Sequence, residues 1–242
     1  MNPRDMPRLA AMAACAVGLM SFMSTGSAQV AGNCGNPFVN HFGPWDYRNA
    51  PRDALNNVET HHFQPLTEAG LRGVQTGPTP AGDISYVLNV FPNHHRALIT
   101  MTRLAERLKT DRPPASQRTL HCWFDRATRF APDDTVVRVL YAQFLTRNGQ
   151  KDQARVQLQL ASDAAKENAF SFFNIGLAFF ELGDHDRALA AAHRALALGL
   201  SRPELVDRLK RVNKWVEPGA EAPLSSVSEP ASAAPSTSPE AR

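Results

Sequence analysis

Residues 172–199 decide the fold, and they read FFNIGLAFFELGDHDRALAAAHRALALG. Within them, Gly183 and Asp184 separate two stretches of helix-forming residues, at a point where a helix must end and the chain reverse. The second stretch carries Ala188 and Ala195, small side chains two helical turns apart that let a facing helix approach closely. The stretch therefore predicts two helices packed against each other across a short turn.

The same pattern returns along the chain at an interval of 34 residues. Six sets of residues keep this interval: Ala127, Ala161 and Ala195; Leu120, Ala154 and Ala188; Phe124, Leu158 and Ala192; Ala142 and Gly176; Leu145 and Phe179; Gly149 and Gly183. Six sets in phase are hard to reach by chance. Because each helix pair buries only one of its faces, neighbouring pairs must stack to complete a core, and the ends need caps. We therefore expect an all-α fold, a short α-solenoid.

The interval and the residues that keep it resemble the tetratricopeptide repeat (TPR). Residues 169–202 carry the closest likeness, with the first-helix signature at Phe172, Ile175, Gly176 and Phe179. Residues 135–168 form a second unit, which polar residues dilute. Residues 101–134 form a partial third unit, because LKTDRPPAS at 108–116 interrupts its first helix. The resemblance implies a TPR-like solenoid in which the first helix of each pair lines a concave groove.

The repeat domain is expected to cover residues 93–216. At its C-terminal end, residues 203–216 predict a capping helix, since Pro203 suits a first helical turn and apolar residues follow at helical spacing. At the other end, Asn93 is expected to cap a helix whose apolar residues form one stripe: Ala97, Leu98, Met101, Leu104 and Leu108.

Residues 29–92 are expected to form an irregular segment that packs on the repeats. NCGNPFVNHFGPWDYRNAPRDA at 33–54 is crowded with Gly, Pro, Asn and aromatic residues, which favours a packed loop over a helix. Two stretches, 56–62 and 84–91, fit either a short helix or a strand. Residues 34–91, with CG, GPWDYR and DISYVLNVFPNHHRAL, also resemble the leading region of exported TPR proteins of Gram-negative bacteria, a likeness that implies no known activity.

Residues 1–28 have the layout of a cleavable secretory signal. Arg4 and Arg8 precede fifteen uncharged residues, and the small residues 26–28 follow. A membrane anchor would need about 20 apolar residues. Lipidation at Cys15 would need an apolar run of about 7 to 15 residues before it. Cleavage after Ala28 fits better than either, so we expect a periplasmic or secreted protein with no stable membrane span after cleavage.

Cleavage leaves two cysteines, Cys34 and Cys122. An even number in an exported protein favours one disulfide between them, and two unpaired thiols are the alternative. At the far end, residues 217–242 hold five prolines, six serines, six alanines and no aromatic residue. Such a segment buries too little apolar surface to offset the entropy of ordering it, so we expect a disordered tail.

The composition and the motifs narrow the function. Hydrophobic residues make up 43% and charged residues 20%, as in ordinary globular proteins, and a net charge of +3 gives no reason to expect nucleic acid as a partner. No GxSxG, SxxK, HExxH or phosphate-binding glycine loop is present, so we expect neither an enzyme nor a cofactor.

The alternative is a metal- or haem-associated accessory protein that uses the histidine pairs of the N-terminal region. Its first choice of ligands would be His62 and His94. CxxCH and the usual zinc spacings are missing from the sequence, which counts against this alternative.

The favoured function is recognition of a protein or peptide partner, as a binding module or scaffold in the cell envelope. By the resemblance, eight residues are expected in the concave groove: Val136, Val139, Gln143, Arg147, Phe170, Phe173, Leu177 and Phe180. The three phenylalanines would give the groove an apolar surface. Alternatively, the chain's own segment FGPWDYR at 42–48 fills the groove, and the sequence leaves both arrangements open.

Overall fold

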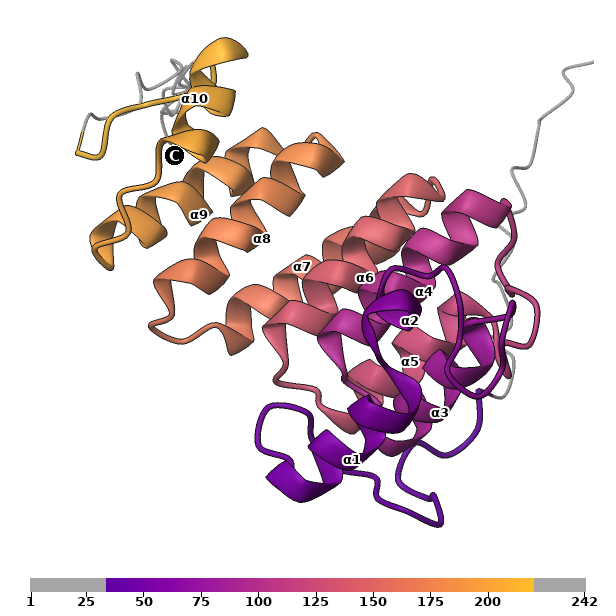
Figure 1. Ribbon diagram of the computed structural model, residues 1–242. Coiled ribbons are helices and arrows are strands. Elements are labelled where there is room, and N and C mark those ends of the chain that lie inside the picture. Colours follow the sequence, from indigo (N-terminus) through magenta and orange to yellow (C-terminus); the bar gives the residue numbers. More distant parts are fainter. Residues whose placement is uncertain (1–33, 220–242) are drawn as a thin grey trace, which may run out of the picture. The chain divides into compact units, whose positions relative to one another are not determined.

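A computed structural model describes residues 34–219 (Figure 1). The expected signal at 1–28 and residues 220–242 of the expected tail lie outside the described residues. Within 34–219 the chain forms ten α-helices and no strand, which confirms the expected all-α class. They are α1 (Arg52–His62), α2 (Pro65–Glu68), α3 (Ala81–Val90), α4 (His95–Leu108), α5 (Leu120–Phe130), α6 (Thr135–Arg147), α7 (Lys151–Ala164), α8 (Ala169–Leu182), α9 (His185–Ala197) and α10 (Pro203–Arg211). None of these helices is long and apolar enough to cross a lipid bilayer.

Two regular helix pairs follow one another from α6 to α9. α6 packs against α7 and α8 against α9, and α8 also lies against α6 and α7, so that the pairs stack as in a solenoid (Figure 1). Within each pair the helices are joined by a turn that holds a glycine with positive φ, Gly149 at 75° and Gly183 at 85°. The expectation that these two glycines occupy equivalent turns is confirmed.

Small side chains set the distance between these helices. Gly176 of α8 is buried, and a Cβ there would collide with the Leu205 side chain and lie 3.2 Å from the Cβ of Ala191. Ala188 and Ala195 of α9 are buried too, as expected of positions that face a neighbouring helix. The close packing of α8 against α9 and α10 therefore depends on residues without bulk.

The capping helix is shorter than expected. α10 ends at Arg211 rather than at residue 216, and the chain turns away at Asn213, whose φ is 55°. Leu205 and Leu209 are buried where α10 meets α8 and α9, whereas Val212 is 40% exposed. The cap is therefore a helix of 9 residues.

The expected partial unit is a helix pair with a long connection. α4 packs on α5 and α6. Eleven residues, 109–119, join α4 to α5, where two or three residues join the helices of the regular pairs. This connection is the stretch that interrupts the 34-residue interval. α4 ends at Lys109, which adopts the left-handed conformation (φ 52°) that Gly183 adopts at the end of α8.

The N-terminal region is more helical than the sequence indicated. Both stretches that fitted either helix or strand are helical, within α1 and at α3. α3 packs against α1 and α4, and its Ile84, Val87 and Leu88 are fully buried, because their spacing puts them on one helix face. The expectation of irregular structure holds for residues 34–50 and 70–80 and is wrong for α1, α2 and α3.

The cap of α4 is His94, not Asn93 as expected. The Nδ1 atom of His94 accepts a hydrogen bond from the backbone N–H of Ala97 at 3.1 Å. Asn93 is fully buried and uses its side chain to bond residues from two other parts of the chain. The apolar stripe expected on α4 is buried except at Leu108, which is 46% exposed.

Candidate functional site

The first helices of the pairs, α4, α6 and α8, border a series of adjoining hollows. The hollow between α6 and α8 has a volume of about 220 Å³ and is lined by Thr135, Val136, Val139, Leu140, Gln143, Ser171, Asn174, Leu177 and Glu181. The hollow between α4 and α6 has about 250 Å³ and is lined by Ile99, Thr102, Arg103, Glu106, Leu140, Gln143 and Arg147. Because both share Leu140 and Gln143, they form one groove, which we call the first-helix groove.

The middle of the first-helix groove combines apolar side chains with two amides. Val136 is 40% exposed, while Val139 and Leu177 are more deeply buried. The amide groups of Gln143 and Asn174 have no hydrogen-bond partner among the described residues. Since a side-chain amide carries two donors and an acceptor, both can bond a ligand that enters the groove.

Charged side chains lie on the α4 side of the groove. Arg147 of α6 bonds Glu106 of α4, Nε to Oε1 at 2.7 Å, and both side chains are 49% exposed. Arg103 of α4 has no ion-pair partner in the part of the chain that the structure describes. Exposed ion pairs contribute little to stability, so these charges are available to a ligand at small cost to the fold.

Five of the eight residues expected in the groove line it, namely Val136, Val139, Gln143, Arg147 and Leu177. The three phenylalanines do not line these hollows, and the apolar surface expected from them is absent from the groove. The apolar part of the groove comes from valine and leucine side chains instead.

The phenylalanines lie elsewhere because the start of α10 covers that side of α8. Arg202, which precedes α10, lies over the ring of Phe173 at 5.7 Å and over that of Phe170 at 5.3 Å. Phe173 is only 5% exposed, whereas Phe170 remains 54% exposed. Phe180 is partly buried, with its ring 5.0 Å from that of His185.

Sequence reasoning missed the share of α4 in the groove and several residues of α6 and α8. α4 belongs to the interrupted unit, so its Ile99 and Arg103 could not be placed by the 34-residue interval. Leu140 and Asn174 carried a usable signal, because Leu140 lies four residues after Val136 and Asn174 lies three residues before Leu177. Residues three or four apart are neighbours on a helix face.

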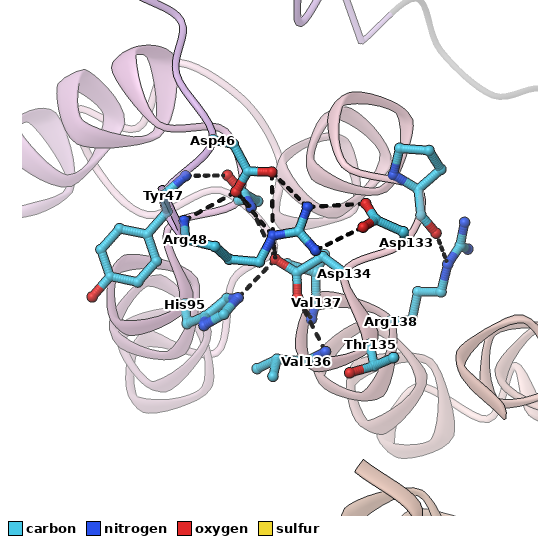
Figure 2. Close-up of polar contacts among 12 residues, drawn as sticks. Asp46, Tyr47, Arg48, His95, Asp133, Asp134, Thr135, Val136, Val137 and Arg138 are labelled. Atoms are coloured by element: carbon cyan, nitrogen blue, oxygen red, sulfur yellow. Dashed lines mark hydrogen bonds and ion pairs between the residues drawn. The ribbon is translucent and has the colours of Figure 1, made fainter. Parts of the chain in front are cut away.

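At the start of α6 the groove opens into a third hollow of about 530 Å³. This hollow shares Thr135, Val136 and Ser171 with the one between α6 and α8. Its wall includes Arg48 and His95. Figure 2 shows that side chains from the N-terminal segment, from α4 and from the turn before α6 meet in this wall.

Arg48 joins the N-terminal segment to the turn before α6 (Figure 2). Its guanidinium donates two hydrogen bonds to Asp133, Nη1 to Oδ2 at 3.0 Å and Nη2 to Oδ1 at 2.9 Å, and it also bonds Asp46. Burial alone would raise the pKa of Asp46, yet hydrogen bonds from Arg48 and Asn93 lower it to about 2. Asp46 is therefore charged at neutral pH and holds Arg48 in place.

Asp134 is the most buried carboxylate of the same wall. Its Oδ1 accepts the N–H groups of Val136 and Val137 and so caps α6. Its Oδ2 accepts a hydrogen bond from Asn93 at 2.9 Å and lies 2.8 Å from Nε2 of His95. Burial would raise the pKa of Asp134, but the bonds with His95 and Asn93 outweigh it and the pKa is lowered. The charged carboxylate thus fixes the start of α6, and with it Val136 at the edge of the groove.

The segment 42–48 packs beside the groove rather than in it. The backbone N–H of Trp45 donates to the carbonyl of Val90 at 2.9 Å, and the Trp45 ring lies 6.0 Å from that of Phe91. The ring of Tyr47 lies 4.0 Å from that of His94. These contacts place the aromatic side chains on α3 and the start of α4, so the alternative in which the segment fills the groove is not the arrangement in the structure.

The two histidines named as metal ligands each bond a carboxylate. His62 Nδ1 lies 2.7 Å from Asp83 Oδ1, and His94 Nε2 lies 3.0 Å from Glu59 Oε1. These contacts join α1 to α3 and α1 to α4. Within residues 34–219, no group of three or more His, Cys, Asp and Glu side chains could hold a metal ion.

Cys34 and Cys122 form a disulfide, with Cα atoms 4.9 Å apart, which confirms the expected pairing. The bond ties the first described residue to the first turn of α5, 88 residues along the chain.

Comparisons with known proteins give limited support to the repeat assignment. No protein-family model matches this chain, and no solved structure matches it. The chain is 26% identical over 91 residues to DnaJ homolog subfamily C member 3 of Gallus gallus, a protein that contains tetratricopeptide repeats. The match covers 36% of this chain, and the chain spans only 18% of that protein's length. The likeness is compatible with a TPR-like fold over that part of the chain.

Proposed function

We propose that this chain is a binding module or scaffold that holds an extended peptide segment of a partner protein in the first-helix groove. The proposal rests on the two unpartnered amides, Gln143 and Asn174, which lie among apolar side chains in a groove that no described part of the chain fills. The stack of helix pairs and the short likeness to a repeat-containing protein support it.

A peptide backbone matches the chemistry of the groove. Each residue of an extended peptide offers one N–H and one C=O, and a side-chain amide can bond both. Successive side chains of the peptide point to opposite faces, about 3.3 Å apart along the strand. Every second side chain can therefore reach the apolar surface of Val136, Val139 and Leu177. Bonds to the backbone would give affinity, and the apolar contacts would select among sequences.

Export to the periplasm belongs to the same proposal. The order of basic, apolar and small residues in 1–28 supports it. The Cys34–Cys122 bond supports it as well, because disulfides are typical of oxidising compartments. A fusion of residues 1–28 to a reporter enzyme that is active only outside the cytoplasm tests export. An inactive reporter that keeps residues 1–28 would contradict this part of the proposal.

Selection from a library of displayed random peptides tests binding. Dissociation constants of the selected peptides are measured for the unchanged chain, for Gln143→Ala/Asn174→Ala, and for the control Asn56→Ala/Gln153→Ala, whose side chains are exposed on other helices. Because one hydrogen bond contributes about 0.5–1.5 kcal/mol, the loss of two should weaken binding about tenfold, while the control should bind as the unchanged chain does. Peptides that bind all three proteins equally would place the site elsewhere.

A further inference from the structure

The described part of the chain begins with residues 34–41, which we call the clasp. Three arginines bond the first residues of the clasp. Each arginine donates a hydrogen bond to a backbone carbonyl of the clasp: Arg118 to Cys34 at 3.3 Å, Arg126 to Asn36 at 2.8 Å and Arg129 to Gly35 at 2.7 Å. The clasp covers these arginines closely, since a Cβ on Gly35 would lie 3.5 Å from Nη1 of Arg126.

Arg126 is poorly accommodated beneath the clasp. It is 2% exposed, and its Nε has no hydrogen-bond partner among the described residues. Burial, and then the nearby charges of Arg118 and Arg129, lower the pKa of Arg126 to about 10. The neighbouring acid, Asp125, pairs with Arg129 at 2.7 Å. The docked clasp therefore keeps a buried, incompletely bonded cation beside like charges, which is unfavourable.

Cys122 lies at a helix N-terminus, a position that would stabilise a thiolate once the disulfide is open. Cys122 lies in the first turn of α5, where its N–H bonds Oγ1 of Thr119 at 3.3 Å. Arginines close to a cysteine also stabilise its thiolate, and Arg126 lies one helical turn after Cys122 on α5. Cys34 is only 6% exposed and Cys122 is more exposed, so we infer that an attacking thiol approaches Cys122 rather than Cys34.

Few other contacts hold the clasp. Phe38 is 58% exposed, with its ring 5.5 Å from that of Phe130. His41 meets Tyr86 edge to face, with ring centroids 6.4 Å apart. In residues 42–48, by contrast, the backbone N–H of Trp45 bonds Val90 of α3, and Asp46, Tyr47 and Arg48 make the hydrogen bonds and ion pairs of the groove wall. Residues before about 42 are thus held mainly by the disulfide and the arginine bonds, whereas residues after it have contacts of their own.

We propose that the Cys34–Cys122 disulfide exchanges reversibly with a dithiol, and that its reduction releases the clasp and uncovers a basic face on α5. A thiolate of the dithiol attacks the sulfur of Cys122, the S–S bond breaks, and Cys34 leaves as a thiolate. The second thiol of the dithiol then displaces Cys122 from the mixed disulfide. Two electrons and two protons pass to the two cysteines, and the dithiol becomes a disulfide.

Release follows from the poor accommodation of the arginines. Once the bond is open, the three guanidinium groups exchange the clasp carbonyls for water, and Nε of Arg126 gains a partner. Residues 42–48 keep their own contacts, so the wall of the first-helix groove stays intact.

The folded, oxidised full-length chain is used for the first test. It is equilibrated in buffers of increasing ratio of reduced to oxidised dithiothreitol. The thiols of Cys34 and Cys122 are quantified separately from Cys15 by alkylation and mass spectrometry of peptides, and helicity is followed by circular dichroism. We expect reduction without loss of helicity. Nitrogen-15 order parameters of residues 34–41 should fall below about 0.6, while those of 42–48 stay unchanged. A bond that yields only when the chain unfolds, or a reduced chain whose clasp stays ordered, would overturn the proposal.

Two variants test the part of the arginines. Arg126→Met removes the buried charge and the unbonded donor, and it should shift the exchange equilibrium toward the disulfide by about tenfold, about 30 mV for a two-electron couple. Arg52→Met, on the exposed surface of α1, is the matched control and should cause no shift. Equal shifts in both variants would count against the proposal. Cys34→Ser/Cys122→Ser gives a reading that is independent of Arg126, because its clasp should be as mobile as that of the reduced chain.

Discussion

The regular helix pairs and the N-terminal region are held together by different interactions. From α7 to α10 the buried side chains are apolar, and every buried polar side chain of the described residues lies between Thr67 and Arg138. In the regular pairs, residues 34 positions apart make equivalent structure, as Gly149 and Gly183 do by adopting positive φ in their turns. In the N-terminal region, single polar residues join parts of the chain that no interval relates.

Asp83 shows how the N-terminal region is organised. Its carboxylate is 1% exposed and accepts the N–H groups of Gln75 and Thr76 and the hydroxyl of Thr76, and it lies 2.7 Å from His62. Burial would raise the pKa of Asp83, but these bonds lower it. One carboxylate thus orders the loop 70–80 and joins α3 to α1. The stability of such a polar cluster depends on each hydrogen-bond partner. The stability of a periodic apolar core depends on the volume and spacing of its side chains.

The largest effect should come from an apolar side chain of the regular pairs. Phe173→Ala should lower the free energy of unfolding by about 3–5 kcal/mol, the usual cost of truncating a buried phenylalanine, because the ring is 5% exposed beneath Arg202. Phe170→Ala, three residues away and 54% exposed, is the matched control and should cost less than about 1 kcal/mol. Urea unfolding measures both, and equal losses would show that the start of α10 does not cover Phe173.

A smaller loss is expected at the centre of the N-terminal contacts. Asn93 accepts the N–H of Tyr47 at 2.9 Å and donates to Asp46 at 2.7 Å and Asp134 at 2.9 Å. Asn93→Ala leaves these groups without their partner, which should lower the free energy of unfolding by about 1–3 kcal/mol. Asn174→Ala, whose amide has no partner in the described chain, should change it by less than about 0.5 kcal/mol in the same urea titration. Equal effects would mean that water replaces the bonds of Asn93 freely.

The contrast between periodic helix pairs and single polar contacts explains which parts of the fold and of the groove the sequence predicts. The helix pairs and the turns at Gly149 and Gly183 follow from the interval, because each repeat supplies the same kind of contact. The resemblance to the tetratricopeptide repeat also predicts most groove residues of α6, but it misplaces Phe173, since only the folded chain brings Arg202 over that ring. The hydrogen bonds of Asn93 could not be predicted from the sequence for the same reason. Its partners lie 41 to 47 residues away and recur at no interval.

A third prediction concerns the residue that ends the first helix of a pair, which is Gly183 in a regular pair and Lys109 in the pair with the long connection. Lys109 ends α4 in the left-handed conformation that Gly183 adopts at the end of α8. Left-handed backbone costs a residue with a side chain roughly 1–2 kcal/mol, and glycine almost nothing. Lys109→Gly should therefore raise the free energy of unfolding by about 1 kcal/mol. Gly183→Ala should lower it by about as much, since open space surrounds the site and only the backbone resists. Thermal and urea unfolding measure both, and changes of the same sign would contradict the comparison.

The smallest expected effect is a pH dependence that arises in the N-terminal region alone. Burial lowers the pKa of His94 below its usual 6.5, and the bond to Glu59 opposes this only in part. As the pH falls below about 6.5, the unfolded chain takes up a proton at His94 before the folded chain does. The free energy of unfolding should therefore fall as the pH is lowered, until the pH passes the folded pKa.

Urea unfolding at several pH values between 7.5 and 5 checks this expectation. His94→Asn is the matched variant, because its side-chain oxygen can still accept the N–H of Ala97 while the titrating group is gone. The carboxylates Asp46 and Asp134 have lowered pKa values, so their contributions are lost only below about pH 4, outside this window. The contributions of the other histidines are common to both proteins and cancel in the difference. We expect stability to fall more steeply with acid in the unchanged chain than in His94→Asn, and parallel curves would show that His94 takes up its proton as readily in the folded chain as in the unfolded one.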